Sequence, residues 1–185
     1  MCGNGARCVV DFAKQLNIFE KECWFLACDG PHLAIWTNSN VSLTMQNVQE
    51  IENGEDYFFL DTGSPHYVKF VDNLESINVF EEGQKISYNQ RFRNDGINVN
   101  FAQIKDKKLY VRTYERGVED ETLACGTGII ASVLSAYEGK LISNHSVDVI
   151  ALGGDLTVNF EKKEFYHNIN LVGPYNCIFK GEIEC

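Results

Sequence analysis

Two short stretches of this chain read alike, although more than a hundred residues separate them. Residues 1–5 (MCGNG) and 124–128 (ACGTG) each place one cysteine in a glycine-rich turn. Apolar residues then follow each turn at helical spacing: Ala6, Val9, Val10, Ala13 and Leu16 after the first, and Ile129, Ile130, Val133, Leu134 and Tyr137 after the second. The repeat predicts an α+β fold of two related units, each with a helix that begins at a cysteine turn.

The position of Cys2 and Cys125 at predicted helix N-termini gives the two thiols a shared chemistry. Such a terminus presents unpaired N–H groups that favour a thiolate and bind a carboxylate. Two turns that face each other would place one thiol on each side of a carbon, one as base and the other as acid. A single cysteine beside glycines is more often a turn or core residue. The matched pair instead predicts epimerisation next to a carboxylate, without a cofactor.

The charge balance argues against several classes of partner. The chain has 26 acidic and 16 basic residues and a formal charge of −10, which repels nucleic acids and anionic lipid surfaces. It begins with no signal-peptide pattern and has no apolar run of membrane-spanning length, so we expect a cytoplasmic protein. Its seven cysteines lack the paired short spacing of zinc ligands, so we expect neither a structural metal nor a disulfide framework.

The pattern of apolar runs and turn residues divides the chain near a polar stretch at residues 50–56. Before it we predict a helix at 6–16 and strands at 23–27, 32–37 and 41–46. After it we predict strands at 57–61, 67–71, 97–104, 108–114, 146–152 and 156–161, helical structure at 80–88, and a helix that starts after Cys125 and is capped by Gly139. A final run at 176–182 is predicted to close either half.

These elements predict two units of unequal completeness. Residues 1–50 would form part of a first half, completed by a strand in 175–185, and residues 55–174 would form the second half. The second cysteine turn is preceded by a long strand-rich block, whereas only Met1 precedes Cys2. If the halves are alike, we expect the first unit to be incomplete.

Several motifs resemble those of the diaminopimelate epimerase family. They are residues 1–8 (MCGNGARC), 114–117 (YERG), 121–128 (ETLACGTG), 63–66 (GSPH), 97–99 (INV) and the pair Gly153–Gly154. The resemblance implies two pseudo-symmetric units, each a curved, mostly antiparallel sheet around a central helix. It also implies cofactor-independent interconversion of LL- and meso-diaminopimelate, in lysine and cell-wall precursor synthesis, by a possible homodimer.

The resemblance also implies roles for individual residues, taken motif by motif. Cys2 and Cys125 would be the acid–base thiols. The backbone around Gly3, Asn4, Gly126 and Thr127 would hold the reacting carboxylate. Asn98 would bind the distal end of the substrate, and Arg116 a carboxylate through a bidentate fork, while Glu115 and His66 would tune a thiol. Ser64 stands where the family usually has a substrate-contacting Asn, and the loop 117–121 is longer and more acidic than the common form.

Three alternatives remain open on the sequence alone. A proline or hydroxyproline racemase also uses two cysteines, but Asn4 stands where those enzymes typically have His. An isomerase like that of phenazine biosynthesis shares the architecture but lacks the paired thiols. The third alternative is an inactive fragment of the epimerase family, in which the incomplete first unit no longer supports catalysis.

Overall fold

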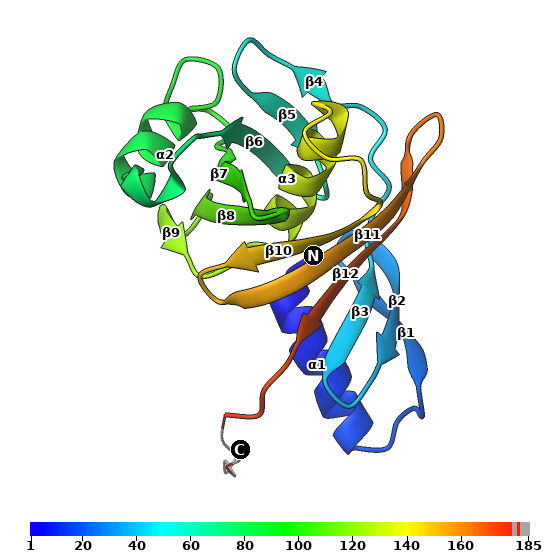
Figure 1. The fold of residues 1–185 in the computed structure, drawn as a ribbon. Coiled ribbons are helices and arrows are strands. Elements are labelled where there is room, and N and C mark those ends of the chain that lie inside the picture. The colour runs from blue at the N-terminus through cyan, green and yellow to red at the C-terminus, as the bar shows by residue number, and fades with distance from the viewer. Residues whose placement is uncertain (179–180, 182–185) are drawn as a thin grey trace.

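Both cysteine turns begin a helix of thirteen residues. We analysed a computed structural model of the chain that describes residues 1–178 and 181 (Figure 1). Helix α1 spans Gly3–Gln15 and helix α3 spans Gly126–Glu138, with Cys2 and Cys125 at their N-caps. A shorter helix, α2 (Val79–Ser87), and a 3₁₀ turn, η1 (Leu74–Ser76), occupy the predicted helical region and the loop before it.

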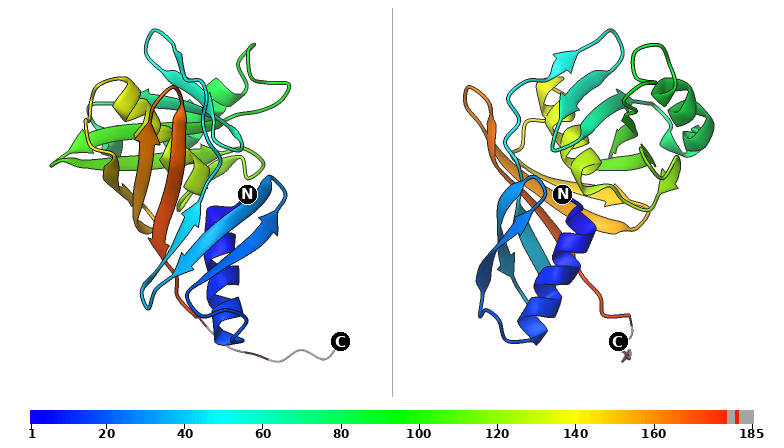
Figure 2. Two further views of the ribbon diagram at one scale, coloured as in Figure 1. Left: turned by 90° about the vertical axis from the view of Figure 1, so that its right-hand side faces the viewer. Right: turned by 180° about the vertical axis from the view of Figure 1, so that it is seen from behind.

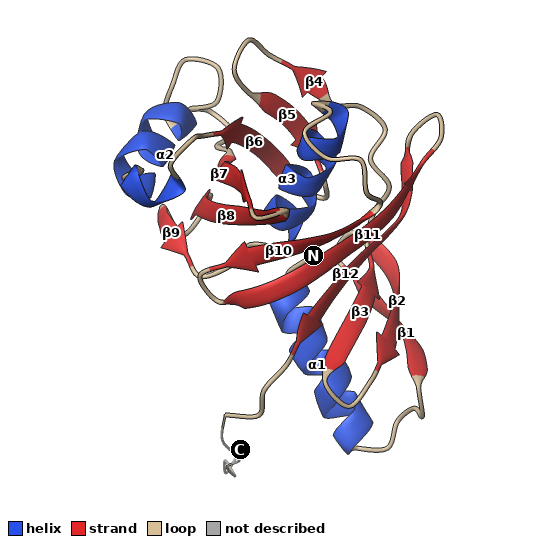
Figure 3. Cartoon of the chain, viewed as in Figure 1, coloured by secondary structure: helices blue, strands red, loops and turns tan. Residues whose placement is uncertain are grey.

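Within the described residues, twelve strands form one mixed, strongly curved sheet (Figure 3). Its order is β1-β2-β3-β12-β11-β10-β8-β7-β6-β5-β4, and β9 pairs with β8 outside this path. Two neighbouring pairs, β6–β7 and β8–β10, are parallel and the others are antiparallel. The strands are β1 (Glu22–Ala27), β2 (Gly30–Trp36), β3 (Asn40–Thr44), β4 (Glu52–Asn53), β5 (Phe58–Asp61), β6 (Pro65–Phe70), β7 (Asn98–Lys105), β8 (Lys108–Glu115), β9 (Asp120–Thr122), β10 (Ser146–Ala151), β11 (Gly154–Lys162) and β12 (Tyr166–Pro174).

The two long helices differ in how much of their surface is covered. Helix α3 lies within the curve of the second part of the sheet, and eleven of its thirteen residues are buried. Helix α1 packs on β2 and β3 with only four buried residues, and its opposite side is uncovered (Figure 2). Apolar side chains on that side and on β1 are exposed: Val9, Phe12, Leu16, Trp24 and Leu26.

Strand β12 joins the two parts of the sheet, and the sequence analysis did not predict it. It pairs with β3 on one side and with β11 on the other. The final strand predicted at 176–182 is not seen at 175–178, which have no regular structure, and its remainder, apart from Gly181, lies outside the described residues. Among the described residues, the strand that pairs with β3 from the later part of the chain is Tyr166–Pro174. Completion of the first half by residues 175–185 stays a prediction. The division into two halves at residues 50–55 stays a prediction.

Gly139 caps α3 as predicted, but for a different physical reason. Its φ is −73°, and the left-handed conformation belongs to the next residue, Lys140, at 58°. A Cβ at Gly139 would lie 2.9 Å from the ring of Phe58. Close packing against β5, rather than backbone freedom, therefore requires glycine there.

In the described part of the chain, no helix is long and apolar enough to span a membrane.

Candidate active site

Ten of the predicted site residues line one cavity of about 260 Å³ between the two helix N-termini. They are Cys2, Gly3, Asn4, Ser64, Asn98, Glu115, Arg116, Cys125, Gly126 and Thr127. The eleventh, His66, is fully buried and reaches this set through hydrogen bonds to Ser64 and Thr127. The structure thus brings together residues that lie far apart along the chain.

The first residues of α1 and α3 touch each other. A Cβ built on Gly126 would lie 3.6 Å from the Cα of Gly3, and a Cβ at either glycine would lie 2.9 Å from Cδ2 of Leu171. Only residues without side chains let the two turns approach so closely beside this leucine. Two sets of free helix N–H groups and two positive dipole ends therefore meet in one cavity, an arrangement suited to a carboxylate.

The two thiols sit in different surroundings. Cys2 is exposed, whereas Cys125 is 8% exposed. Burial raises the pKa of the Cys125 thiol, and the charges of Glu115 and Cys2 add to this rise. The Thr127 hydroxyl and the Gly128 amide act in the opposite direction. Cys125 is therefore held as the neutral thiol, although donors are in place to stabilise its thiolate.

A hydrogen-bonded group of polar side chains lies behind Cys125. Thr127 Oγ1 is 3.5 Å from the Cys125 sulfur and 3.0 Å from His66 Nε2. Ser64 Oγ lies 3.0 Å from the same His66 nitrogen. Burial lowers the pKa of His66 to about 3, assisted by the positive charge of Arg116. The imidazole is therefore neutral near pH 7, and it acts as a hydrogen-bonding group rather than as a charge.

Asn98 and the Glu115–Arg116 pair line the cavity next to Ser64. The Asn98 amide donates to Ser64 Oγ at 3.2 Å and to the Pro65 carbonyl, and its oxygen accepts from the Arg116 backbone at 3.0 Å. Arg116 Nη1 donates to the Asp95 carbonyl, and Thr122 donates to Glu115. Since both Asn98 amide hydrogens are occupied, this side chain holds the wall of the cavity together.

Comparison with known proteins agrees with this geometry. A model of the family "diaminopimelate epimerase" matches residues 58–176, more than half of the chain. The diaminopimelate epimerase of Flavobacterium psychrophilum is 44% identical over 186 residues, which cover 99% of this chain and 73% of that protein. The chain belongs to the diaminopimelate epimerase family. The enzyme of the same name from Chlorobaculum tepidum is 37% identical and is 74% covered. Members of this family are isomerases.

Solved structures of other proteins share this fold. A PhzF-family phenazine biosynthesis protein from Enterococcus faecalis matches the whole chain and 74% of its own length, with a TM-score of 0.70 and 16% identity. Another from Bacillus anthracis matches 94% of this chain and 73% of its own, with a TM-score of 0.71 and 13% identity. At these identities the likeness shows the shared α+β fold alone, and that fold confirms the predicted class.

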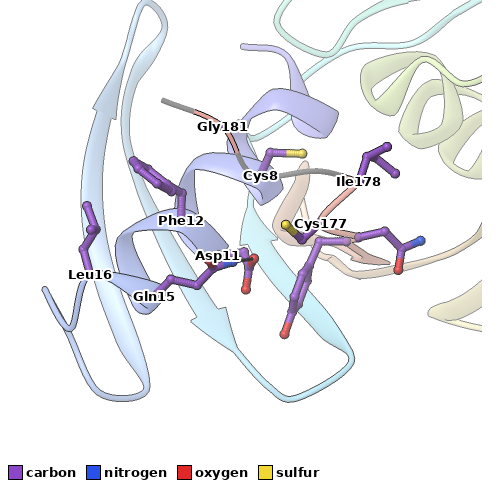
Figure 4. Close-up of a pocket in the computed structure, with 10 residues that line it drawn as sticks. Cys8, Asp11, Phe12, Gln15, Leu16, Cys177, Ile178 and Gly181 are labelled. Atoms are coloured by element: carbon purple, nitrogen blue, oxygen red, sulfur yellow. Dashed lines mark hydrogen bonds between the residues drawn. The ribbon is translucent and has the colours of Figure 1, made fainter. Parts of the chain in front are cut away.

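A second cavity in the described part of the chain is larger than the one between the two helix N-termini. It measures about 650 Å³ and lies between the exposed side of α1 and residues 175–178 (Figure 4). Its lining includes Cys8, Phe12 and Cys177 but none of the predicted site residues. Size alone therefore does not identify the site, whereas the convergent polar groups at the smaller cavity do.

Across the described residues, no cluster of three or more His, Cys, Asp or Glu side chains is arranged to hold a metal.

Sequence reasoning missed two buried polar residues beside His66. Asn100 on β7 and Thr113 on β8 are directly opposite in register and are joined by a hydrogen bond of 2.9 Å. Asn100 is two residues beyond Asn98, so the two side chains share a face of the strand. That alternation of polar residues in an otherwise apolar strand was the available signal. We predicted the backbone of Thr127 as a binding group but overlooked its hydroxyl.

Proposed function

We propose that this chain interconverts LL- and meso-diaminopimelate by two-thiol acid–base catalysis. The observation that carries the proposal is the meeting of two cysteine-bearing helix N-termini at Gly3 and Gly126 in one cavity. Membership of the family supports the choice of substrate. Neither thiol alone could remove a proton from one face of the α-carbon and supply one to the other.

The different surroundings of the two thiols support a proposal for their starting roles. Because burial raises the pKa of Cys125, that residue begins as the thiol and donates the incoming proton. Cys2, at the exposed side of the cavity, then serves as the thiolate base, and the roles exchange in the reverse reaction. The free N–H groups at both turns bind the α-carboxylate and stabilise the charge that develops on it.

The distal end of the substrate would meet Arg116 and Glu115. Arg116 keeps guanidinium hydrogens beyond the one used by the Asp95 carbonyl, and these suit a carboxylate. Glu115 lies beside the cavity and supplies a negative charge for an ammonium group. Ser64, which is shorter than the Asn usual in the family, is already bonded to His66 and Asn98. The proposed enzyme would be cytoplasmic, would act as a homodimer and would serve lysine and cell-wall precursor synthesis.

Deuterium exchange at the α-carbon tests the proposal. The chain is incubated with diaminopimelate in deuterated water, and label at the α-carbon is measured by mass spectrometry. We expect exchange that falls at least a hundredfold in Cys2→Ser and in Cys125→Ser. Cys8→Ser is the matched control and should exchange at the original rate, because Cys8 lines the other cavity.

Other results would contradict the proposal in identifiable ways. Exchange into proline but not diaminopimelate would indicate the racemase alternative. No exchange into either substrate by the folded chain would indicate the inactive fragment. Full exchange in the two cysteine variants would exclude the two-thiol mechanism.

A further inference from the structure

Three polar side chains on adjacent strands are buried behind the candidate active site. His66 on β6, Asn100 on β7 and Thr113 on β8 are each at most 3% exposed. They face the first turn of α3, where Gly128 leaves room for them: a Cβ at Gly128 would lie 2.2 Å from Asn100 Oδ1. Burying such groups costs free energy unless each finds a partner, and here every one does.

The hydrogen bonds of Asn100 have a defined direction. Its oxygen accepts from the Thr113 hydroxyl at 2.9 Å. Its nitrogen donates to the Tyr67 carbonyl at 3.1 Å and lies 3.0 Å from His66 Nδ1. Turning the amide around would set its oxygen against the Tyr67 carbonyl, two acceptors in contact. An amide nitrogen has no lone pair to offer, so His66 Nδ1 must be the acceptor and carry no proton.

This direction continues toward Cys125. A neutral imidazole with a bare Nδ1 has its proton on Nε2, which lies 3.0 Å from the hydroxyl oxygens of both Thr127 and Ser64. The Nε2 hydrogen can then be donated to the Thr127 oxygen, which leaves the hydrogen of the Thr127 hydroxyl for a neighbouring acceptor. The Cys125 sulfur lies 3.5 Å from that oxygen.

We propose that Asn100, held by Thr113, is a positioning residue that fixes the tautomer of His66, so that the Thr127 hydroxyl donates its hydrogen to the Cys125 sulfur. This proposal rests on the assignment of Cys125 as an acid–base thiol. Asn100 never touches substrate in this scheme. Its effect is to stabilise the thiolate that Cys125 forms whenever the reaction removes its proton.

The charged groups around the two side chains are compatible with this arrangement. Arg116 is the charge that acts on His66, and it favours the neutral ring, consistent with a His66 pKa lowered to about 3. Glu115 on β8 and Cys2 at the start of α1 face Cys125, and both disfavour its thiolate. The Thr127 hydroxyl and the Gly128 amide are the groups that offset them. Loss of the Thr127 donor should therefore have a measurable effect on the Cys125 pKa.

Nitrogen NMR of the wild-type chain gives the first test. With ¹⁵N-labelled histidine, protonated and bare ring nitrogens have well-separated shifts, and His66→Gln identifies the signals of His66 among the four histidines. We expect a proton on Nε2, none on Nδ1, and no change between pH 7.5 and pH 5. A proton on Nδ1, or a charged ring at pH 6, would overturn the proposal without any variant.

Alkylation of Cys125 as a function of pH gives the second test, read from its own peptide by mass spectrometry. Asn100→Asp should accept a proton from Nδ1 and reverse the tautomer, and Asn100→Leu removes the donor without adding charge. Both should raise the Cys125 pKa by about one unit, a tenfold loss of thiolate at neutral pH. Thr113→Val should shift the pKa in the same direction, and Thr113→Ser should restore it.

The two tests separate this proposal from the proposed function, because neither measures turnover. An unchanged Cys125 pKa in folded Asn100→Leu and Asn100→Asp would overturn the positioning role even if the chain is an active epimerase. If those variants fail to fold, the wild-type tautomer and the Thr113 pair decide. The expected tautomer and pKa shifts in a chain that catalyses no exchange would overturn only the proposed function.

Discussion

At the residue scale, His66 links the site to the stability of the chain. Its ring is fully buried and neutral, with a pKa lowered to about 3 by burial and by Arg116. In the unfolded chain an ordinary histidine takes up a proton near pH 6.5. As the pH falls below 6.5, the unfolded state therefore gains a proton that the folded state refuses. This contribution to stability is present above pH 6.5 and is lost progressively down to pH 3.

We expect the free energy of unfolding of the wild-type chain to fall by about 1 kcal/mol more than that of His66→Gln between pH 6 and pH 5. Urea titrations at half-unit intervals measure both slopes. The comparison is specific in this range, because the carboxylates with lowered pKa, such as Asp29 and Glu119, lose their contributions only near and below their ordinary values. Parallel slopes for the two proteins would contradict a neutral His66.

At this scale, the sequence could predict functional residues where they are neighbours along the chain. Cys2 and Cys125 lie in compact motifs whose residue types and spacing predicted two facing turns, and the resemblance to the family implied the roles of the Glu115–Arg116 pair. Asn100 and Thr113 are isolated polar residues in strands, and their meaning depends on the β7–β8 register, which pairs them directly. Register is set by the whole sheet, so no local pattern reported it.

At the element scale, the third position of each long helix is a glycine, but the two have different neighbours. A Cβ at Gly5 would meet Cys2 at 3.8 Å, an ordinary contact. A Cβ at Gly128 would collide with Asn100 at 2.2 Å. The same residue type thus occupies equivalent positions in the two repeats, and only the second is required by packing.

We therefore expect opposite effects from matched substitutions. Gly128→Ala should lower the free energy of unfolding by about 1 to 3 kcal/mol, since buried Asn100 must shift. Gly5→Ala should raise it by up to about 1 kcal/mol, because alanine favours helix. Thermal and urea denaturation of both variants measure the difference. Equal effects would show that α3 accommodates a side chain at this position.

The elements themselves were predicted well where periodicity and turn residues coincided, as in α1, β1–β3 and β10. Strand β12 was missed because the residues around Asn168 have low strand propensity. Asn168 also adopts a φ of 52°, and the pairing of β11 with β12 shifts register between Asn159 and Glu161. Irregularity of this kind interrupts the alternation that marks a strand.

At the scale of the whole molecule, one buried cation connects α1 to the joining strand. Arg7 donates to the carbonyls of Pro174 and Gly3 and to the side chain of Asn4. Asn4 in turn donates to the Ala124 carbonyl, next to the second cysteine. Removing the guanidinium would leave one buried and two partly buried acceptors without this donor, which costs about 1 to 3 kcal/mol.

Arg7→Met should therefore loosen the first part of the chain before the second. Both tryptophans, Trp24 and Trp36, lie in β1 and β2, so their fluorescence reports on that part, while far-ultraviolet circular dichroism reports on the whole sheet. We expect the fluorescence transition of Arg7→Met to move to lower urea than the dichroism transition. Arg93→Met, at an exposed position, is the control. Coincident transitions in Arg7→Met would contradict the role of Arg7.

The contact of Leu171 with both glycine turns couples the two cysteine segments to strand β12. One methyl group on β12 packs against both segments that carry the thiols, at the point where Gly3 and Gly126 meet. The packing around the two cysteine turns therefore includes a hydrocarbon side chain from a third part of the chain. A smaller or larger side chain at Leu171 would therefore act on both cysteine turns together, although Leu171 lies more than forty residues from either cysteine along the chain.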